Sequence, residues 1–517
     1  MIEESSKMAS SEIVGQKAVF SNYSFLLLRT LLVSGVSLTS TVFIYRILSV
    51  ENVGLATIYV AVLNTVTGLF LVWPLTGLLQ YGRNEYDRTR RLEQTFGSTL
   101  LLMMVLFAIS TTACILLRKP LMSYMGLSVQ WLWLLILNTF FIMLNRLLSQ
   151  VFYITASIVV LSLLDLLEPI LMFIFAITIW STVGSIPVTT YLLVSLSLSA
   201  ITFTLYLLFS RKYIFPFRWS FWEVWQIVRF SGFLYMAAIF TFIYDQFDYL
   251  IINHYRSAEQ LAYYSLAYRI YGFITTLPML SINLVYPIMI SYRNLGREDL
   301  FQKYSSRTVT QMLFFWSIGC IVFLLILPFM IPLFFGRIFS YSIPSLSLFC
   351  LAAIFQFTIA CNSPIITSHE RVDWSMKVNF VGTIIIAFGN LLLIPRLGIF
   401  GAALATLISY AFNSLAYAYL TSRLIGRRYK GLEIIMALFC LPMVVVTIIK
   451  IPSMIRISIF CLDLAGMFWW SYKCGVFDRA DLFFLEHLTI PRLVRKVIYT
   501  VFGWLEPPQK MLKGMEL

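Results

Sequence analysis

Long apolar segments alternate with short polar segments along most of the chain. Each apolar segment has about 20 residues, the length that an α-helix needs to cross the hydrocarbon core of a bilayer. The pattern predicts fourteen membrane-spanning helices, at 22–45, 54–79, 95–117, 130–152, 157–180, 188–210, 230–252, 260–289, 306–330, 343–367, 375–394, 398–422, 432–449 and 454–471. The alternating ten-residue segments of a membrane β-barrel are not present in the sequence.

The composition supports a membrane protein. The chain is 60% hydrophobic and only 12% charged, whereas a soluble protein has about 25% charged residues. This balance argues against a soluble enzyme of 517 residues. The seven cysteines lie mostly in apolar segments and form no Cys-x-x-Cys pair, so we interpret them as packing residues.

The basic residues predict the orientation of the chain. The net charge is +14, but Lys and Arg are gathered in short polar segments near 83–91, 211–218, 293–307 and 423–430, which does not indicate a nucleic-acid partner. These segments all fall on one side if both termini lie in the cytoplasm. We therefore expect a multi-pass protein of the cytoplasmic (inner) membrane with both termini cytoplasmic.

A short internal repeat predicts two lobes. Ser49–Gly54 (SVENVG) and Ser257–Ala262 (SAEQLA) share the pattern Ser-x-Glu-Asn/Gln-aliphatic-small at an offset of 208 residues. Each copy follows the first span of a six-span unit, on the predicted outer side. Both units enter from the cytoplasm, so their pseudo-two-fold axis would run along the membrane normal, an arrangement suited to alternating access.

The repeat and the charge pattern divide the chain into predicted segments: a cytoplasmic N-terminal segment (1–21), an N-lobe of helices 1–6 (22–210), a cytoplasmic amphipathic linker (211–229), a C-lobe of helices 7–12 (230–425), helices 13–14 (426–471) and a cytoplasmic amphipathic tail (472–517). The linker carries Trp219, Trp222 and Trp225 among charged residues, which is typical of the headgroup layer of a membrane.

The stretch 388–410 predicts a tight helical hairpin. Pro395 is expected to end one helix, because proline lacks the N–H donor and clashes with the preceding turn. Gly398 and Gly401 would let the chain reverse, and the small residues after them would let two helices approach closely in the bilayer.

Three motifs resemble a known family. Arg46-Ile-Leu-Ser-Val-Glu-Asn-Val-Gly54, the segment Asp248–Pro287, and Ile394-Pro-Arg-Leu-Gly398 followed by Gly401-Ala-Ala are similar to elements of the oligosaccharide flippases of the Wzx type, in the MATE-like (MOP) exporter superfamily. The match depends on the order and spacing of these motifs over about residues 22–425. It departs at Ala262, where the family more often has glycine.

The resemblance implies a MATE-like exporter that moves polyprenyl-pyrophosphate-linked oligosaccharide repeat units to the outer face of the membrane, for O-antigen, capsule or another surface polysaccharide. The implied partners are the lipid-linked oligosaccharide, membrane lipids, and the polysaccharide polymerase and glycosyltransferases of the same pathway. A small-molecule or drug exporter of the same fold is the alternative. A membrane polymerase or ligase is a third, which the short outer loops argue against.

Charged residues inside predicted spans are the candidate site residues, because an intramembrane charge is costly. Arg29, Arg146 and Arg269 could bind an anionic headgroup, since a guanidinium can hold a pyrophosphate with two hydrogen bonds. Two acidic pairs, Asp165 with Glu168 and Asp245 with Asp248, are candidates for coupling to H⁺ or Na⁺, and each pair is expected to share one helix face.

A structural ion pair between helices remains the alternative for each of these residues. Asp463, which lies outside the two lobes, is interpreted as structural. The sequence shows no catalytic residues in a recognisable pattern, no metal-binding histidine pair and no Walker A motif, so we expect neither an enzyme nor a cofactor. The driving force would be an ion gradient or the gradient of the cargo itself.

Overall fold

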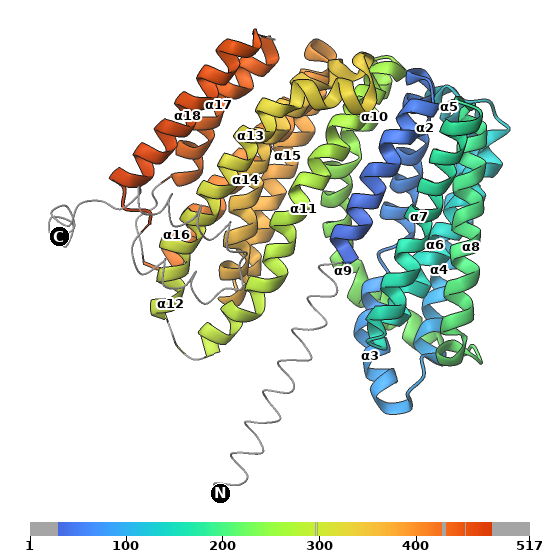
Figure 1. The fold of residues 1–517 in the computed structure, drawn as a ribbon. Coiled ribbons are helices and arrows are strands. Elements are labelled where there is room, and N and C mark those ends of the chain that lie inside the picture. Colours follow the sequence, from blue (N-terminus) through green and yellow to red (C-terminus); the bar gives the residue numbers. More distant parts are fainter. Residues whose placement is uncertain (1–28, 295, 297, 427–430, 450, 478–517) are drawn as a thin grey trace, which may run out of the picture. The chain divides into compact units, whose positions relative to one another are not determined.

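The computed structural model describes residues 29–477, except for 295, 297, 427–430 and 450. This part of the chain is built from helices and contains no strand (Figure 1). Twelve of its helices are long and apolar enough to cross a membrane. The predicted class, an all-α polytopic membrane protein, is therefore confirmed.

The helices are bounded as follows. The first half of the chain contains Arg29–Ile47, α2 (Val50–Thr65), the π-helical η1 (Val66–Leu71), α3 (Leu75–Thr89), α4 (Glu93–Leu116), α5 (Arg118–Met125), α6 (Trp131–Ile154), α7 (Ile158–Thr182), α8 (Val188–Ile214), α9 (Phe221–Asp245), α10 (Phe247–Tyr255) and α11 (Ala258–Asn294). The second half contains α12 (Glu298–Lys303), η2 (Tyr304–Thr308), α13 (Val309–Phe335), η3 (Arg337–Ser342), α14 (Ile343–Ser368), α15 (Val372–Leu397), α16 (Ile399–Leu424), α17 (Leu432–Ile449) and α18 (Ser453–Lys473).

Twelve predicted spans fall on the twelve long apolar helices, and the other two, 230–252 and 260–289, fall on α9–α10 and α11. The second span ends earlier than predicted. Its helix stops at Leu71, and a new helix begins at Leu75 directly after Pro74. Pro74 cannot donate a backbone hydrogen bond to the turn before it, which is why the apolar run 54–79 does not form one continuous helix.

The seventh predicted span is also interrupted. The α9 helix ends at Asp245, and α10 begins at Phe247 after a break at Gln246, whose φ is −129°. Asp245 and Asp248 therefore lie on two helices, and the expectation that they share one face of a single helix was wrong. A three-residue spacing implies a common face only where the helix is unbroken.

The described residues form two compact units. The first comprises the chain up to Thr276 together with Leu333–Ser345 and Thr383–Thr406, and the second comprises Leu277–Pro332, Leu346–Gly382 and the chain from Leu407 onward. The predicted lobes, 22–210 and 230–425, rest on the repeat rather than on contacts and stay a prediction. The predicted N-terminal segment 1–21 and most of the tail 472–517 lie outside the described residues.

The core of the first unit lies between η1, α3, α4, α6, α7 and α8. Its largest fully buried members include Leu71, Phe96, Leu147 and Phe152. In the second unit, α13 and α14 are joined by a hydrogen bond from the indole N–H of Trp316 to the carbonyl oxygen of Ala353, at 3.1 Å. The Trp316 ring also stacks on Phe357, with ring centroids 5.2 Å apart. Aliphatic side chains make up most of the first core, and Phe96 and Phe152 lie among them.

The predicted hairpin is present, but its turn begins later than expected. The α15 helix continues through Pro395 to Leu397, so the prediction that Pro395 ends it was wrong. Gly398 makes the turn, with a φ of +62° that favours glycine. The backbone N–H of Gly398 donates to the carbonyl oxygen of Ile394 at 2.8 Å, and the Arg256 guanidinium donates to the carbonyl oxygens of Ile394 and Pro395. This side-chain cap satisfies the end of α15 despite the proline.

Candidate functional site

The first candidate site is a pocket of about 500 Å³ in the first unit, which we call the Arg146 pocket. Two helix interruptions form its walls: the π-helical η1 with the following break at Pro74, and the break between α9 and α10. Arg146 enters from α6. The lining residues are Asn64, Gly68, Val72, Trp73, Thr76, Arg146, Ala238, Thr241, Phe242, Asp245 and Gln246.

The guanidinium of Arg146 is available to a ligand. Among the described residues it forms no ion pair and no hydrogen bond, although Asp245 lines the same pocket. The Asp245 carboxylate instead accepts a hydrogen bond from the hydroxyl group of Tyr268, at 3.3 Å. The pocket therefore presents an uncompensated cation beside amide, hydroxyl and aromatic side chains, a combination that suits an anionic ligand with polar substituents.

A second pocket, of about 200 Å³, lies between the helix Arg29–Ile47 and α11; we call it the Arg269 pocket. Arg269 lines it together with hydroxyl side chains and a glycine, namely Ser34, Ser37, Thr41, Thr276 and Gly272. The Arg269 guanidinium donates to the hydroxyl oxygen of Thr41 at 3.4 Å. No carboxylate pairs with it among the described residues. One guanidinium and several hydroxyl donors form a suitable environment for a phosphate oxygen.

Arg29 differs from the other two arginines, because its charge is compensated. Its guanidinium forms an ion pair with the Asp165 carboxylate of α7 and donates to the Tyr153 hydroxyl group at 3.2 Å. Asp165 also accepts a hydrogen bond from the Tyr206 hydroxyl of α8. The structural alternative, an ion pair that joins helices, thus describes this residue in the structure. The three predicted headgroup arginines do not converge on one pocket.

The acidic candidates also separate. Asp248 is 1% exposed and accepts hydrogen bonds from the Tyr264 hydroxyl group and from the backbone N–H of Tyr249. Glu168 lies three residues after Asp165 on α7, and its carboxylate has no hydrogen bond or ion pair to another described residue. Only Asp245 lines a pocket with one of the predicted arginines.

Sequence reasoning missed the neutral part of both pockets. Asn64, Gln246, Trp73 and the hydroxyl residues of the helix Arg29–Ile47 carry no charge, so the rule that flags intramembrane charges passes over them. Pro74 was a usable signal, because a proline that breaks a span exposes backbone and polar side chains next to the break. Nothing in the sequence marks the break at Gln246.

Two solved structures share this architecture. A structure described as the lipid II flippase MurJ in an inward closed conformation matches with a TM-score of 0.66 and 14% identity, over 87% of this chain and 99% of that one. An inward-facing multidrug resistance MATE family transporter of the MOP superfamily matches with a TM-score of 0.55 and 14% identity, over 78% and 94% of the two chains. The chain has the MurJ and MATE fold. No family model and no curated protein matches the sequence.

Both pockets lie in the first unit of this fold. At 14% identity the likeness extends to the fold and not to the residues of a site. The Wzx-type assignment is therefore still carried by the sequence motifs. Within the described residues no group of three or more His, Cys, Asp or Glu side chains could hold a metal ion. Asp463 of α18 lies in the second unit, 8% exposed, with one carboxylate oxygen unpaired.

Proposed function

We propose that the protein is a flippase that moves polyprenyl-pyrophosphate-linked oligosaccharide repeat units from the cytoplasmic to the outer face of the cytoplasmic membrane by alternating access. The observation that carries this proposal is the guanidinium of Arg146, unpaired among the described residues, in a pocket of about 500 Å³. Arg146 lies in the predicted span 130–152, and a cation within a membrane span is costly unless a ligand or a partner supplies the negative charge. A pyrophosphate supplies that charge, and the amides beside Arg146 can donate to sugar hydroxyls.

We propose the Arg269 pocket as a second, separate site for a phosphate group. Its volume of about 200 Å³ is too small for an oligosaccharide and large enough for a phosphate group. Arg146 and Arg269 are the proposed headgroup residues. Arg29, paired with Asp165, would take part only if transport breaks that pair. The MurJ structure, whose description names a lipid II flippase, supports a lipid-linked cargo for this fold.

Ion coupling remains part of the proposal. Asp165, Glu168, Asp245 and Asp248 are the proposed carriers of H⁺ or Na⁺. Of these, Asp245 lies at the Arg146 pocket and Asp248 is one helix break away from it. Binding of an ion at this break could therefore respond to occupation of the pocket. We further propose that both termini are cytoplasmic, and that polymerase and glycosyltransferases of a surface-polysaccharide pathway work with the protein.

A drug exporter is the second candidate, and one observation favours it. Asp245 lies in the Arg146 pocket, where a carboxylate could attract an organic cation, and a multidrug MATE transporter shares the fold. The two candidates predict opposite charge requirements. A flippase for a pyrophosphate needs Arg146, whereas a cation exporter needs Asp245 and gains from removal of the nearby positive charge.

The deciding experiment uses a host strain that lacks the gene. The side of the membrane on which the lipid-linked oligosaccharide accumulates is measured by its accessibility to a sugar-modifying reagent in intact spheroplasts. The proposal expects accumulation on the cytoplasmic face, rescue by wild type, and no rescue by R146Q. Normal outward movement without the gene would refute it. Resistance to organic cations that depends on Asp245 but not on Arg146 would establish the exporter instead.

A further inference from the structure

The linker between α8 and α9 is docked on the N-terminal end of α4. The backbone N–H of Arg218 donates to the carbonyl oxygen of Glu93 at 3.1 Å, and the N–H of Ser220 donates to the hydroxyl oxygen of Ser98 at 3.1 Å. The ring of Phe217 stacks on Phe96, with centroids 5.8 Å apart. A side chain at Gly97 would collide with the carbonyl group of Arg218. The linker is therefore a fixed part of the first unit rather than a loose connection.

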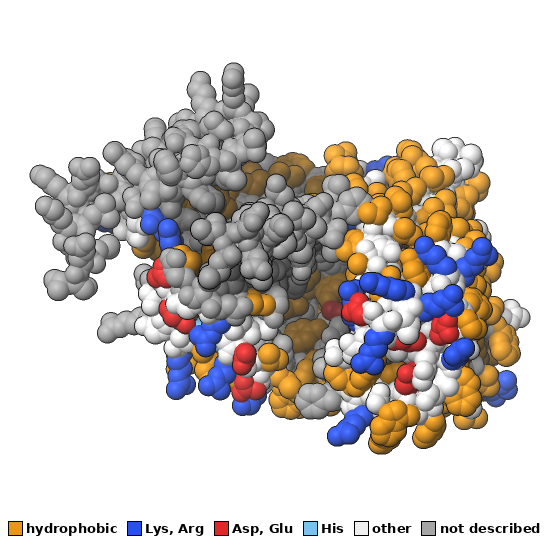
Figure 2. All heavy atoms as spheres, turned by 90° about the horizontal axis from the view of Figure 1, so that it is seen from below, with side chains coloured by type: hydrophobic (Ala, Val, Ile, Leu, Met, Phe, Trp, Pro, Cys, Tyr) orange, Lys and Arg blue, Asp and Glu red, His pale blue; other side chains and the backbone are white. Residues whose placement is uncertain are grey.

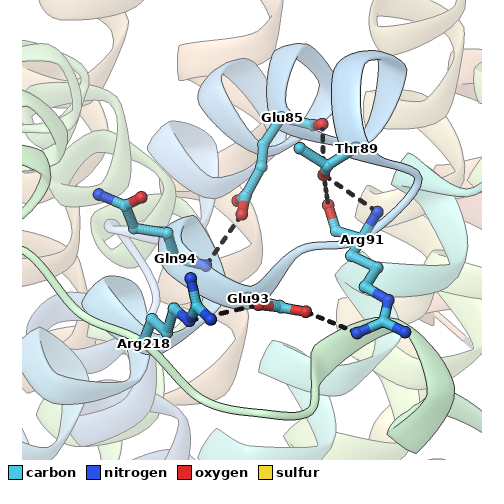
Figure 3. Close-up of polar contacts among 6 residues, drawn as sticks. All are labelled: Glu85, Thr89, Arg91, Glu93, Gln94 and Arg218. Carbon is cyan, nitrogen blue, oxygen red and sulfur yellow. Dashed lines mark hydrogen bonds and ion pairs between the residues drawn. The ribbon is translucent and has the colours of Figure 1, made fainter.

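The carboxylates of this surface are used internally. Figure 3 shows Glu85 accepting from the backbone N–H of Gln94, and the same carboxylate accepts from that of Thr95, each at 2.9 Å, so that Glu85 caps the start of α4. Figure 3 also shows Glu93 between two guanidinium groups, those of Arg91 at 2.8 Å and Arg218 at 3.5 Å. The contacts of these two carboxylates are thus made with backbone N–H groups and with Arg91 and Arg218.

Two further cations belong to an ordered cluster. Arg90 lies over the ring of Tyr86 (5.6 Å to the centroid), and Lys212 lies over the ring of Tyr213 (4.7 Å). The two tyrosine rings contact each other edge to face, 6.1 Å apart. A backbone hydrogen bond of 2.7 Å from Leu92 to Tyr213 fixes the α3–α4 turn to the end of α8.

We call this cluster, Arg90, Tyr86, Tyr213 and Lys212, the tyrosine clasp. Both cations are exposed and have no carboxylate partner among the described residues. The aromatic rings orient them without neutralising them. The clasp therefore holds two positive charges at one cluster of aromatic rings, open to solvent.

Exposed tryptophans follow along the docked linker. The side chains of Trp219 and Trp222 are 65% and 66% exposed. In the right half of Figure 2, Lys and Arg side chains lie together with Asp and Glu side chains on this face of the first unit, and hydrophobic side chains lie around them. Indoles favour the headgroup layer of a bilayer, and α4 and α8 leave the predicted hydrocarbon region at this end.

We propose that the tyrosine clasp binds the headgroup of an anionic phospholipid, while Trp219 and Trp222 anchor the linker in the same headgroup layer. Two open cations beside interfacial tryptophans match a phosphate diester that carries no compensating amine, such as phosphatidylglycerol. A soluble acidic protein that contacts only the clasp fits less well, because it would leave Trp219 and Trp222 exposed to water. The inference is independent of the cargo, since the clasp lies outside both pockets.

The test counts lipids that are bound to the full-length chain. The purified protein is equilibrated with mixed micelles of phosphatidylglycerol and phosphatidylcholine, and retained lipids are quantified by native mass spectrometry. Wild type is expected to retain phosphatidylglycerol preferentially. The double variant R90Q/K212Q should weaken that binding by about fivefold for each cation removed, with no change in phosphatidylcholine.

The control removes an equal charge elsewhere on the same unit. R118Q/K119Q neutralises two adjacent exposed cations at the start of α5 and should retain phosphatidylglycerol like wild type. The charge-conserving R90K/K212R should do the same. Unchanged binding in R90Q/K212Q, or an equal loss in both neutralised pairs, overturns the proposal. Unchanged binding in R90Q/K212Q would instead indicate that this surface binds a soluble partner.

A second measurement on wild type does not depend on how the variants fold. Raising the ionic strength from about 0.05 M to about 0.5 M should release phosphatidylglycerol, because a headgroup held by exposed charges is screened by salt. Phosphatidylglycerol that stays bound at the higher ionic strength would contradict an electrostatic clasp.

Discussion

The backbone carbonyl group of Ala258 occupies the place where a Cβ atom on Gly54 would lie. The two residues belong to the two copies of the internal repeat, Ser49–Gly54 and Ser257–Ala262. The helices α2 and α11 therefore meet backbone to backbone at their predicted outer ends. A contact this close requires a residue without a side chain, which gives the glycine of the first copy a structural reason.

We expect Gly54→Ala to destabilise the first unit by about 1–3 kcal/mol, because the added methyl group must displace a backbone atom. Thermal unfolding of the purified protein measures this. Gly35→Ala is the matched control, since no atom lies within 4 Å of the position of its Cβ. That variant should be neutral or slightly more stable, as expected for alanine in place of a helical glycine. Equal stability of the two variants would show that α2 and α11 separate without cost.

The ion pair between Arg29 and Asp165 predicts that neutralising one partner destabilises the protein more than neutralising both. The two side chains are 16% and 22% exposed, so removal of one charge leaves the other largely shielded from solvent without an opposite charge. Arg29→Gln is expected to lower the free energy of unfolding by about 3 kcal/mol. In the double variant with Asp165→Asn, most of that loss should be recovered, because neither charge remains.

A double-mutant cycle on thermal stability checks this prediction. Additive losses in the double variant would mean that the ion pair does not stabilise the unit. Arg146→Gln serves as the contrast, because its guanidinium has no carboxylate partner among the described residues. Its removal should not lower stability by a comparable amount, although it should abolish transport.

Helix positions could be predicted from the sequence, and the relationships between charges could not. Apolar runs located every long helix because the bilayer requires about 20 such residues in a row. The breaks at Pro74 and Gln246 depend instead on local backbone hydrogen bonding, which hydropathy does not register. For that reason Asp245 and Asp248 were assigned to one face although they lie on two helices.

The three intramembrane arginines show the same limit. Their positions in the sequence are equivalent by the rule that intramembrane charge marks function. Only the tertiary contacts distinguish Arg29, which meets Asp165 across 136 residues of chain, from Arg146 and Arg269, which line pockets. Ion pairing between distant helices is a property of packing, and a single sequence does not encode it in any local pattern.

The Arg146→Lys variant tests whether the site needs only a positive charge or also the parallel N–H donors of a guanidinium. Lysine keeps the positive charge but cannot hold two oxygens of a pyrophosphate with parallel hydrogen bonds. We expect transport of the lipid-linked oligosaccharide to fall about tenfold or more, whereas Arg269→Lys should be tolerated better, because hydroxyl side chains supply further donors there. Flipping assays in complemented cells measure both. Full activity of the Arg146→Lys variant would mean that charge alone suffices.

Asp248 and Asp245 should differ in their response to an ion gradient. Asp248 is buried and held by Tyr264, while Asp245 faces the Arg146 pocket. If Asp248 carries the coupling ion, Asp248→Asn should keep slow, gradient-independent flipping and lose acceleration by an imposed H⁺ or Na⁺ gradient. Proteoliposomes with and without the gradient measure this. Retained acceleration would leave Asp245, Asp165 and Glu168 as candidates.

Glu223 predicts a pH dependence at the docked linker. It lies in the first turn of α9, before the predicted span 230–252, and its carboxylate accepts from the Ser98 hydroxyl group at 3.3 Å. Burial, and next the nearby Glu85 carboxylate, raise the pKa of Glu223 above its ordinary 4.5. Between 4.5 and the raised pKa, the folded protein keeps a proton that the unfolded chain has lost. The contribution of this group to the free energy of unfolding is therefore fully present below pH 4.5. It is lost as the pH rises through the raised pKa of Glu223.

Glu223→Gln should remove this part of the pH dependence, so that thermal stability changes less with pH above 4.5 in the variant than in wild type. Ser98→Ala should act in the opposite sense. Its hydroxyl group lowers the pKa of Glu223, so its loss raises that pKa further and moves the decline in stability to higher pH. Melting curves over a pH series for the three proteins measure both shifts. Identical pH profiles for wild type and Glu223→Gln would show that the linker stays docked whether or not this carboxyl group is charged.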